Sequence, residues 1–388
     1  MRRGLSMAAL SMGVFGIIST EIGLVGVLPL VASRSHVSVA EAGLLVSVFA
    51  VVVAASGPFG VLLTERFDRK SVLLLAMGVF ALSNAVYAVS ESFPVLVVFR
   101  ILPAVMHPVY FAFALTAAGS MAAPGKAAGA AARVFAGVTL GFAFGVPAMS
   151  FLADRFTLSV AFAAASVVNI LALVGIALWV PALPAAGRTA ARVSVGTLRR
   201  PRVWLQLVTV TAIFVVMFST YSYFADLLGT VAGVPGPMVS VLLLVFGVLM
   251  VGGNFLFARL IVRGLRATLL GFLLAYAVLY VVLALVAPWA WAIGLLVIPW
   301  SLVHSGGLLL GQSLIAEETS DAPEFGNSLF VSSSNIGVAL GSALGAWVIG
   351  ASGVRSVLIL GAVAALLSLV LVLAVRSPAR RAEVDLPG

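Results

Sequence analysis

Four ionisable residues stand inside long apolar stretches of the sequence: Glu21, Arg100, His107 and His304. A charge near the centre of a membrane helix costs at least about 2.5–3.5 kcal/mol, so such residues are usually functional. We predict that Glu21 is a proton site, ionised while it pairs with Arg100 in one state and protonated in another. The alternative interpretation is a static pair that only fixes helix packing.

Helix geometry brings three of these groups to similar depths. With a rise of about 1.5 Å per residue, Arg100, Glu21 and His107 lie roughly 10, 15 and 20 Å below the outer surface. Arg100 and His107 share one helix face, so Glu21 can reach either cation if the first and fourth helices adjoin. His107 is a candidate proton relay, although a histidine satisfied by a neighbouring carbonyl explains it equally well. His304 has no acidic residue near it in sequence, and we assign it no coupling role.

The elements that position these groups are apolar helices. The 388-residue chain is 62% hydrophobic and 9% charged, whereas soluble domains are roughly 45–50% apolar and about 25% charged. This composition excludes a soluble enzyme. The chain has no cysteine, and its three histidines lack metal-ligand spacing. We therefore expect no metal and no cofactor, and the lack of a Gly-x-x-x-x-Gly-Lys-Ser/Thr loop argues against ATP-driven pumping.

Twelve stretches are long and apolar enough to cross a membrane, because about 20 apolar residues of helix span the hydrocarbon core. Their predicted limits are 7–32, 43–63, 71–90, 94–121, 129–152, 157–180, 203–229, 237–260, 267–287, 289–316, 325–350 and 354–375. We therefore predict an all-α membrane protein of two six-helix bundles. Its predicted parts are an N-terminal bundle (1–180), a cytoplasmic linker (181–202), a C-terminal bundle (203–375) and a cytoplasmic tail (376–388).

Basic residues alternate from one side of the predicted membrane to the other. The chain has 22 Lys and Arg against 13 Asp and Glu, a net charge of +9, and eighteen basic residues share one side if the amino terminus is cytoplasmic. The positive-inside rule then places both termini in the cytoplasm. The charge therefore reports membrane topology, not a nucleic-acid partner. The expected partners are lipid, protons and a small-molecule substrate, and we expect a monomer.

The two halves of the chain share a weak internal repeat. A shift of 197 positions aligns 65–73 with 262–270, and two arginines three residues apart recur in both segments. Two related six-helix bundles with a cavity between them at mid-membrane form a transporter architecture. The alternative is that basic loops resemble one another through composition alone.

Polar and aromatic residues within the predicted helices could line such a cavity. The candidates are Tyr110, Phe111, Tyr221, Trp300, Gln312 and Asn335. Because few charges lie in the membrane, the cavity suits a neutral, cationic or amphipathic molecule better than a polyanion.

Glycines at every fourth position mark the fifth predicted helix, followed by a proline: Gly137, Gly141, Gly145 and Pro147. Aligned on one face, they let another helix backbone come close. A packing seam needs no transport, whereas the added proline favours a seam that bends. A comparable stripe lies in the eleventh helix, at Gly337, Gly341 and Gly345.

These segments resemble the major facilitator superfamily, and within it the bacterial drug:proton antiporters close to the arabinose and sugar efflux permeases. The segment 20–29 is similar to that branch's first-helix signature, and Arg100 matches its fourth-helix arginine motif. The stretch 104–108 is similar to its histidine-bearing motif, and 137–147 to the antiporter motif of helix five. The resemblance implies the major facilitator fold and proton-driven export by alternating access.

The resemblance also implies a cytoplasmic gate. The residues Glu65, Arg66, Arg69 and Lys70 resemble the superfamily's loop between helices two and three, except that Glu65 replaces an aspartate and Asp68 a glycine. In this chain the basic residues of the loop can meet the acidic stretch 317–324 if the halves close on the cytoplasmic side. Exposed pairs contribute only about 0–1 kcal/mol each, so only a network would bias the states.

We therefore predict proton-coupled efflux, by antiport, of a small organic molecule such as a drug, sugar or metabolite. A proton-coupled importer or facilitator of a sugar or nucleoside is the second interpretation, and the direction of flux under a reversed pH gradient distinguishes the two. A non-transporting receptor or scaffold is the third. The short predicted tails, which hold no soluble module, argue against it.

Overall fold

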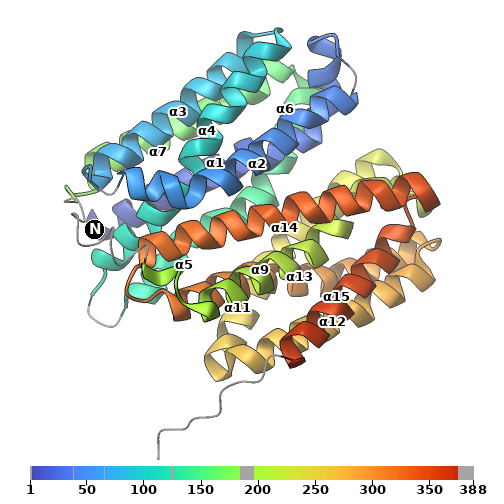
Figure 1. Ribbon diagram of the computed structural model, residues 1–388. Helices are drawn as coiled ribbons and strands as arrows, with labels where there is room; N and C mark the ends of the chain where they lie inside the picture. Colours follow the sequence, from blue (N-terminus) through green and yellow to red (C-terminus); the bar gives the residue numbers. More distant parts are fainter. Residues whose placement is uncertain (1, 38, 65, 124–125, 184–195, 375–388) are drawn as a thin grey trace, which may run out of the picture.

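The computed structural model describes residues 2–37, 39–64, 66–123, 126–183 and 196–374, and within them it is all helical. The first half contains α1 (Arg2–Arg34), α2 (Val39–Thr64), α3 (Arg69–Val89), α4 (Phe93–Ser120), α5 (Ala127–Leu140), the π-helical segment η1 (Gly141–Gly145), α6 (Val146–Arg155) and α7 (Leu158–Trp179). The second half contains α9 (Pro201–Tyr221), α10 (Phe224–Asp226), the π-helical segment η2 (Leu227–Val231), α11 (Gly236–Arg263), α12 (Leu265–Val286), α13 (Ala290–Glu318), α14 (Pro323–Ser352) and α15 (Ser356–Ala374). Figure 1 shows the two halves as two stacked bundles, the first in blue to green and the second in yellow-green to red.

Twelve helical spans in the described residues are long and apolar enough to cross a bilayer, which confirms the predicted number. The fifth span joins α5, η1 and α6. The prediction of one continuous helix over 203–229 is wrong, because α9 ends at Tyr221 and a turn follows. Ser222 shares a hydrogen bond with Ser342 of α14, and the hydroxyl of Tyr223 donates to the main-chain oxygen of Ser342. Glu65, 184–195 and 375–388, parts of the predicted gate, linker and tail, lie outside the described residues.

The glycine stripes occupy matching places in the two halves. A Cβ at Gly137 of α5 would overlap the main-chain oxygen of Ser11 in α1, and a Cβ at Gly337 of α14 would overlap that of Thr211 in α9. Thus the fifth helix packs closely on the first helix of one half, and the eleventh packs closely on the seventh in the other. This correspondence supports the internal repeat over chance similarity of loops.

The close approach at Gly137 gives a direct stability prediction. We expect Gly137→Ala to lower the free energy of unfolding by about 1–3 kcal/mol, because the added methyl group must force α1 and α5 apart. A Cβ at Gly129, in the same helix, would meet no atom within 4 Å, so Gly129→Ala is the matched control and should lose no stability. Thermal unfolding of the purified protein measures both, and equal melting temperatures for the two variants would contradict a tight seam.

Most of the basic residues that the structure describes lie at one end of the bundle, which we call the basic end. There the start of α1 meets the end of α7, because Ser6 donates a hydrogen bond to the main-chain oxygen of Trp179. At the opposite end, Arg34 of α1 donates to the main-chain oxygens of Ala88 in the last turn of α3 and of Ser90 just after it. Each end therefore ties several helices of the first half together.

The two halves touch along two seams. On one, α2 crosses α14 so closely that a Cβ at Gly57 would overlap the hydroxyl of Ser332. On the other, α11 crosses η1 where a Cβ at Gly247 would overlap the backbone of Ala143. Beside this second crossing, the amide of Asn254 in α11 donates a hydrogen bond to Thr139 of α5. The two halves are thus joined near the middle of their helices. One cavity lies between the halves at this level, and others lie closer to the two ends.

Candidate functional site

A carboxylate and an imidazole meet between α1 and α4. Oε2 of Glu21 lies 3.1 Å from Nε2 of His107, and the two side chains are 14% and 4% exposed. The imidazole packs against the rings of Phe49 and Phe111, with centroids 5.8 and 4.8 Å away. The contact lacks hydrogen-bond alignment, and neither ring nitrogen has a hydrogen-bond partner among the residues that the structure describes. Apart from the carboxylate of Glu21, the imidazole therefore has no polar partner among these residues.

Arg100 has different partners from those predicted. Its buried guanidinium donates hydrogen bonds to three main-chain oxygens, those of Thr20 (3.0 Å) and Glu21 (2.8 Å) in α1 and Leu45 (3.1 Å) in α2. In this conformation the carboxylate of Glu21 pairs with His107 instead of Arg100. The sequence allowed either cation to meet the carboxylate, and pairing with Arg100 in another state stays a prediction, because in this conformation the backbone holds the guanidinium. Arg100 thus supplies a fixed positive charge and an anchor for α1.

A buried polar cluster, missed by the sequence reasoning, precedes Glu21 on α1. The amide of Asn84 in α3 donates to Oγ1 of Thr20 at 2.8 Å, and the amide of Asn169 in α7 approaches the same oxygen at 3.5 Å. Both asparagines are fully buried in spans that are otherwise apolar. Their position in the middle of such helices is a signal that could have identified them. The cluster fixes α1 against α3 and α7, and so fixes the direction of Glu21.

Glu21 and His107 line a small central cavity between the two halves. Its volume is about 70 Å³, which has room for a few water molecules but not for a drug-sized molecule. The second half contributes the polar residues Ser334 and Asn335 of α14. The remaining lining residues are apolar: Ile18, Ile22, Phe111, Phe135, Val138, Phe142, Phe214, Phe218, Leu308, Phe330, Val331 and Val338.

The six predicted cavity residues do not lie in one place. Phe111 and Asn335 line the central cavity. Tyr110 and Trp300 are fully buried in packed regions, and Tyr110 donates its hydroxyl to the main-chain oxygen of Leu10 at 3.0 Å, so neither lines the cavity in this conformation.

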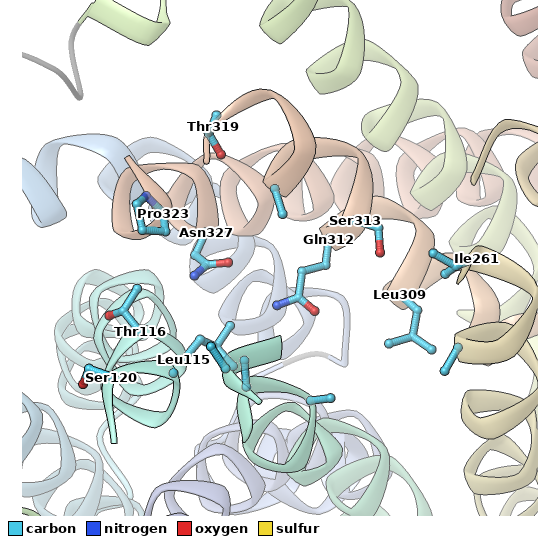
Figure 2. Close-up of a pocket in the computed structure, with 16 residues that line it drawn as sticks. Leu115, Thr116, Ser120, Ile261, Leu309, Gln312, Ser313, Thr319, Pro323 and Asn327 are labelled. Carbon is cyan, nitrogen blue, oxygen red and sulfur yellow. The ribbon is translucent and has the colours of Figure 1, made fainter. Parts of the chain in front are cut away.

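The remaining two predicted residues line other spaces. Tyr221 borders a cleft of about 380 Å³ at the opposite end, together with Pro147 of the helix-five motif. Gln312 lines a cavity of about 520 Å³ at the basic end, which we call the vestibule. Figure 2 shows the vestibule between α4 and α5 on one side and α11, α13 and α14 on the other. The predicted cavity residues that line a space therefore lie in three separate spaces.

Aromatic contacts between the halves separate these spaces. Toward the basic end, Phe135 of α5 meets Phe330 of α14 with ring centroids 6.2 Å apart, and Phe111 lies 6.4 Å from Phe135. Toward the opposite end, Phe142 of η1 meets Tyr221 of α9 at 6.2 Å. The central cavity is thus bordered on both sides by ring pairs that join one half to the other.

An ion pair closes the basic end between the halves. Nε of Arg69 lies 2.5 Å from Oε1 of Glu324 at the start of α14, and the hydroxyl of Thr116 in α4 lies 3.1 Å from the same oxygen. The predicted meeting of the loop with the acidic stretch is confirmed for Arg69. Lys70 instead donates to the main-chain oxygen of Ala177 at 2.8 Å, which ties α3 to α7. We call the Arg69–Glu324–Thr116 contact the latch.

The other loop residues stabilise the loop itself. Asp68, in the place of a usual glycine, has an extended backbone and caps α3 by accepting from the backbone and hydroxyl of Ser71 at 2.8 and 2.9 Å. Burial alone would raise the pKa of Asp68, but these hydrogen bonds and one from the Leu183 backbone hold it below its ordinary value of 3.8. The helix cap made by ionised Asp68 is therefore complete above pH 3.8, and its contribution to stability is lost only as the pH falls through the lowered pKa. Arg66 lies over the ring of Phe67, 4.9 Å from its centroid.

Comparison with known proteins agrees with this architecture. The family model of the Major Facilitator Superfamily matches residues 6–323. The inner membrane transport protein YdhP of Escherichia coli (strain K12) is 30% identical over 367 residues, 94% of each chain. A chloramphenicol resistance protein of Streptomyces lividans is 31% identical over 250 residues, 63% of this chain and 62% of that one.

A solved structure shows the same fold. The human organic anion transporter MFSD10 (TETRAN) superimposes with a TM-score of 0.70 at 16% identity, covering 95% of this chain and 99% of that one. The twelve spans and the bacterial relatives identify a multi-pass protein of the inner membrane. The matched family consists of membrane transporters, which are not enzymes. Because the family model matches most of the chain and YdhP aligns with nearly its whole length, the chain belongs to the Major Facilitator Superfamily.

Proposed function

We propose that this transporter exports small organic molecules in exchange for protons. The observation that carries the proposal is the Glu21–His107 pair, which lines the cavity between the two halves. A group that binds a proton where the substrate must pass can couple the two fluxes, because each state of alternating access exposes the same site to one side. The name of the chloramphenicol resistance relative supports export of an uncharged drug-like molecule.

The charges of the site give the proton cycle a direction. Arg100 is permanently charged, so the group of Arg100, Glu21 and His107 is neutral when the carboxylate is ionised and the imidazole is not. One added proton gives it a charge of +1. A full crossing of 100 mV by one charge releases about 2.3 kcal/mol. If the basic end faces the cytoplasm, as the positive-inside rule favours, the negative interior draws the protonated site toward that side, where the proton leaves and the substrate enters.

Flux driven by a pH gradient tests the proposal. Proteoliposomes with an acidic lumen should accumulate radiolabelled chloramphenicol as protons leave, and a protonophore should abolish the accumulation. Accumulation that requires the reverse gradient, acidic outside, would instead identify proton-coupled import. Equilibration to equal concentrations, whatever the gradient, would identify a facilitator.

The latch should control access from the basic end. Because Glu324 is buried and Arg69 is its partner, we expect Arg69→Gln and Glu324→Gln each to shift the halves toward opening by about tenfold. The readout is the rate at which a membrane-impermeant maleimide labels Ser334→Cys in the central cavity, in a chain that has no cysteine of its own. The double variant should add little to either single variant, because both remove the same contact.

A second ion pair provides the control for the latch. Arg200 and Asp321 form a bidentate pair with distances of 3.0 and 2.6 Å, but both belong to the second half. Arg200→Gln should therefore leave the labelling of Ser334→Cys unchanged. Equal acceleration by Arg200→Gln and by Arg69→Gln would show that loss of charge at the basic end, not the latch, opens the cavity.

A further inference from the structure

The vestibule is the space at the basic end that matches a ligand in size. Its volume of about 520 Å³ lies within the roughly 300–1,000 Å³ of small-molecule sites, whereas the central cavity has about 70 Å³. The two spaces are separated by the rings of Phe111, Phe135 and Phe330, which lie about one helical turn deeper than the vestibule residues Leu115, Ala131 and Asn327. A molecule that enters from the basic end therefore meets the vestibule first.

The vestibule offers amides and hydroxyls but no charge. Among the residues that the structure describes, its lining contains no Asp, Glu, Lys, Arg or His. Three hydroxyls are already engaged, since Ser120 and Thr319 donate to carbonyl oxygens of their own helices and Thr116 hydrogen-bonds to Glu324 within the latch. The carboxylate of Glu324, which follows the lining residue Pro323, is held by the latch. An ion in this space would lose water without meeting a counter-charge, so the lining favours an uncharged occupant.

Two side-chain amides supply the unused hydrogen-bonding capacity. Gln312 of α13 and Asn327 of α14 are half-buried, and neither makes a hydrogen bond with any residue that the structure describes. Figure 2 shows both side chains projecting into the space that faces α4. Each amide carries two N–H donors and an acceptor oxygen. Together they can hold an acceptor group of a ligand whose apolar part rests on the surrounding alanines and leucines.

We propose that the vestibule is an entry site that selects uncharged amphipathic molecules with a strong hydrogen-bond acceptor, bound by Gln312 and Asn327. The inference rests on the proposed function in that the occupant is the exported substrate on its way to the central cavity. Charge selection then takes place before the substrate reaches Glu21.

A matched pair of probes tests this charge selection. Triphenylphosphine oxide is uncharged and carries a strong P=O acceptor, whereas tetraphenylphosphonium has a similar shape and a positive charge. Ser313→Cys places a thiol in the vestibule of a chain without cysteines, and its reaction with N-ethylmaleimide reports occupancy. The oxide should protect this thiol at a concentration at least about tenfold lower than the phosphonium. Ala267→Cys, exposed at the basic end outside the vestibule, should be protected by neither.

Variants of the amides locate the binding groups. In the Ser313→Cys background, Gln312→Leu and Asn327→Leu should each weaken protection by the oxide about three- to tenfold. Gln312→Glu should reverse the preference and favour the phosphonium, a gain that a misfolded protein cannot show. Equal protection by the two probes, or no loss in either leucine variant, would overturn the proposal.

The protection experiment tests the entry site independently of the proposed export. Protection is measured at equilibrium without a gradient, so it does not depend on proton coupling. If the oxide binds through the amides but no pH-driven export occurs, the vestibule stands and proton antiport is wrong. If export is driven by protons but the oxide never protects Ser313→Cys, the entry site is wrong and antiport stands.

Discussion

Glu21→Gln is expected to abolish accumulation against a gradient while leaving exchange of substrate across the membrane intact. Glutamine has nearly the same shape as glutamate but binds no proton in the physiological range, so the site loses the carboxylate that carries the transported proton. In acid-loaded proteoliposomes a difference of about 1.7 pH units supplies about 2.3 kcal/mol per proton, equivalent to a substrate gradient of about fifty-fold. The accumulation ratio in acid-loaded proteoliposomes should therefore fall from tens-fold to about one.

An exposed acid provides the matched control. Glu91 lies in the connection between α3 and α4 and is exposed to solvent, so Glu91→Gln should accumulate substrate as the natural chain does. Counterflow, in which unlabelled substrate inside drives uptake of labelled substrate, shows whether Glu21→Gln is folded and can still alternate. If Glu21→Gln retains both counterflow and full accumulation, Glu21 is not the coupling group. If it loses both activities while remaining monodisperse and thermally stable, Glu21 serves the movement of the halves instead of proton coupling.

The structure also explains why His107 stands beside Glu21. Its ring lies among the aromatic side chains of Phe49 and Phe111, and its nitrogens have no hydrogen bond within the described chain. An imidazole satisfied by a neighbouring carbonyl, the alternative interpretation from the sequence, is therefore not what the structure shows. The carboxylate and the imidazole at 3.1 Å are instead close enough to pass one proton between them.

The helices could be predicted from the sequence because the membrane imposes their length. Every backbone group in lipid must be paired within its own segment, so apolar runs of about 20 residues read directly as spans. The break after Tyr221 could not be predicted, since it depends on hydrogen bonds of Ser222 and Tyr223 to Ser342, a residue about 120 positions away. Local apolarity carries no information about such a distant contact.

The depth of the ionisable residues in the membrane was also predictable from the sequence, but the hydrogen-bond and ion-pair partners of each residue were not. A fixed rise per residue placed Glu21, Arg100 and His107 at similar levels, and the structure does bring them together. Which cation meets the carboxylate depends on helix rotation and on where a long side chain turns. The long guanidinium of Arg100 reaches backbone oxygens of α1 and α2, so the shorter imidazole takes the carboxylate.

Gln312 shows the same limit for the substrate path. Its polarity in an apolar helix marked it as a candidate for lining a cavity, and it does line one. Gln312 lines the vestibule and not the central cavity because the ring contact of Phe135 with Phe330 lies between these two spaces. Contacts between the two halves depend on the relative position of the two bundles, which cannot be predicted from the residue spacing within one helix.

Arg100→Lys is expected to lower the free energy of unfolding by about 2–4 kcal/mol. The guanidinium reaches three carbonyl oxygens on two helices at 2.8–3.1 Å, and a lysine ammonium, a single point charge on a flexible stem, cannot reach all three at once. At least one hydrogen bond from a charged donor is then lost, at about 1.5–3 kcal/mol each. Thermal unfolding of the purified protein should show a clear drop in melting temperature.

Arg34→Lys is the matched control, because Arg34 also donates to main-chain oxygens, at 3.1 and 2.8 Å, but is only half-buried. Water can replace its lost hydrogen bonds, so the loss of stability should stay below about 1 kcal/mol. The pH dependence of transport separates the anchor from a carboxylate partner. As an anchor, Arg100 can be replaced by another cation without moving the midpoint of transport against pH, because Glu21 keeps His107 beside it. A shifted midpoint with unchanged stability would restore the direct Glu21–Arg100 pair that the sequence predicted.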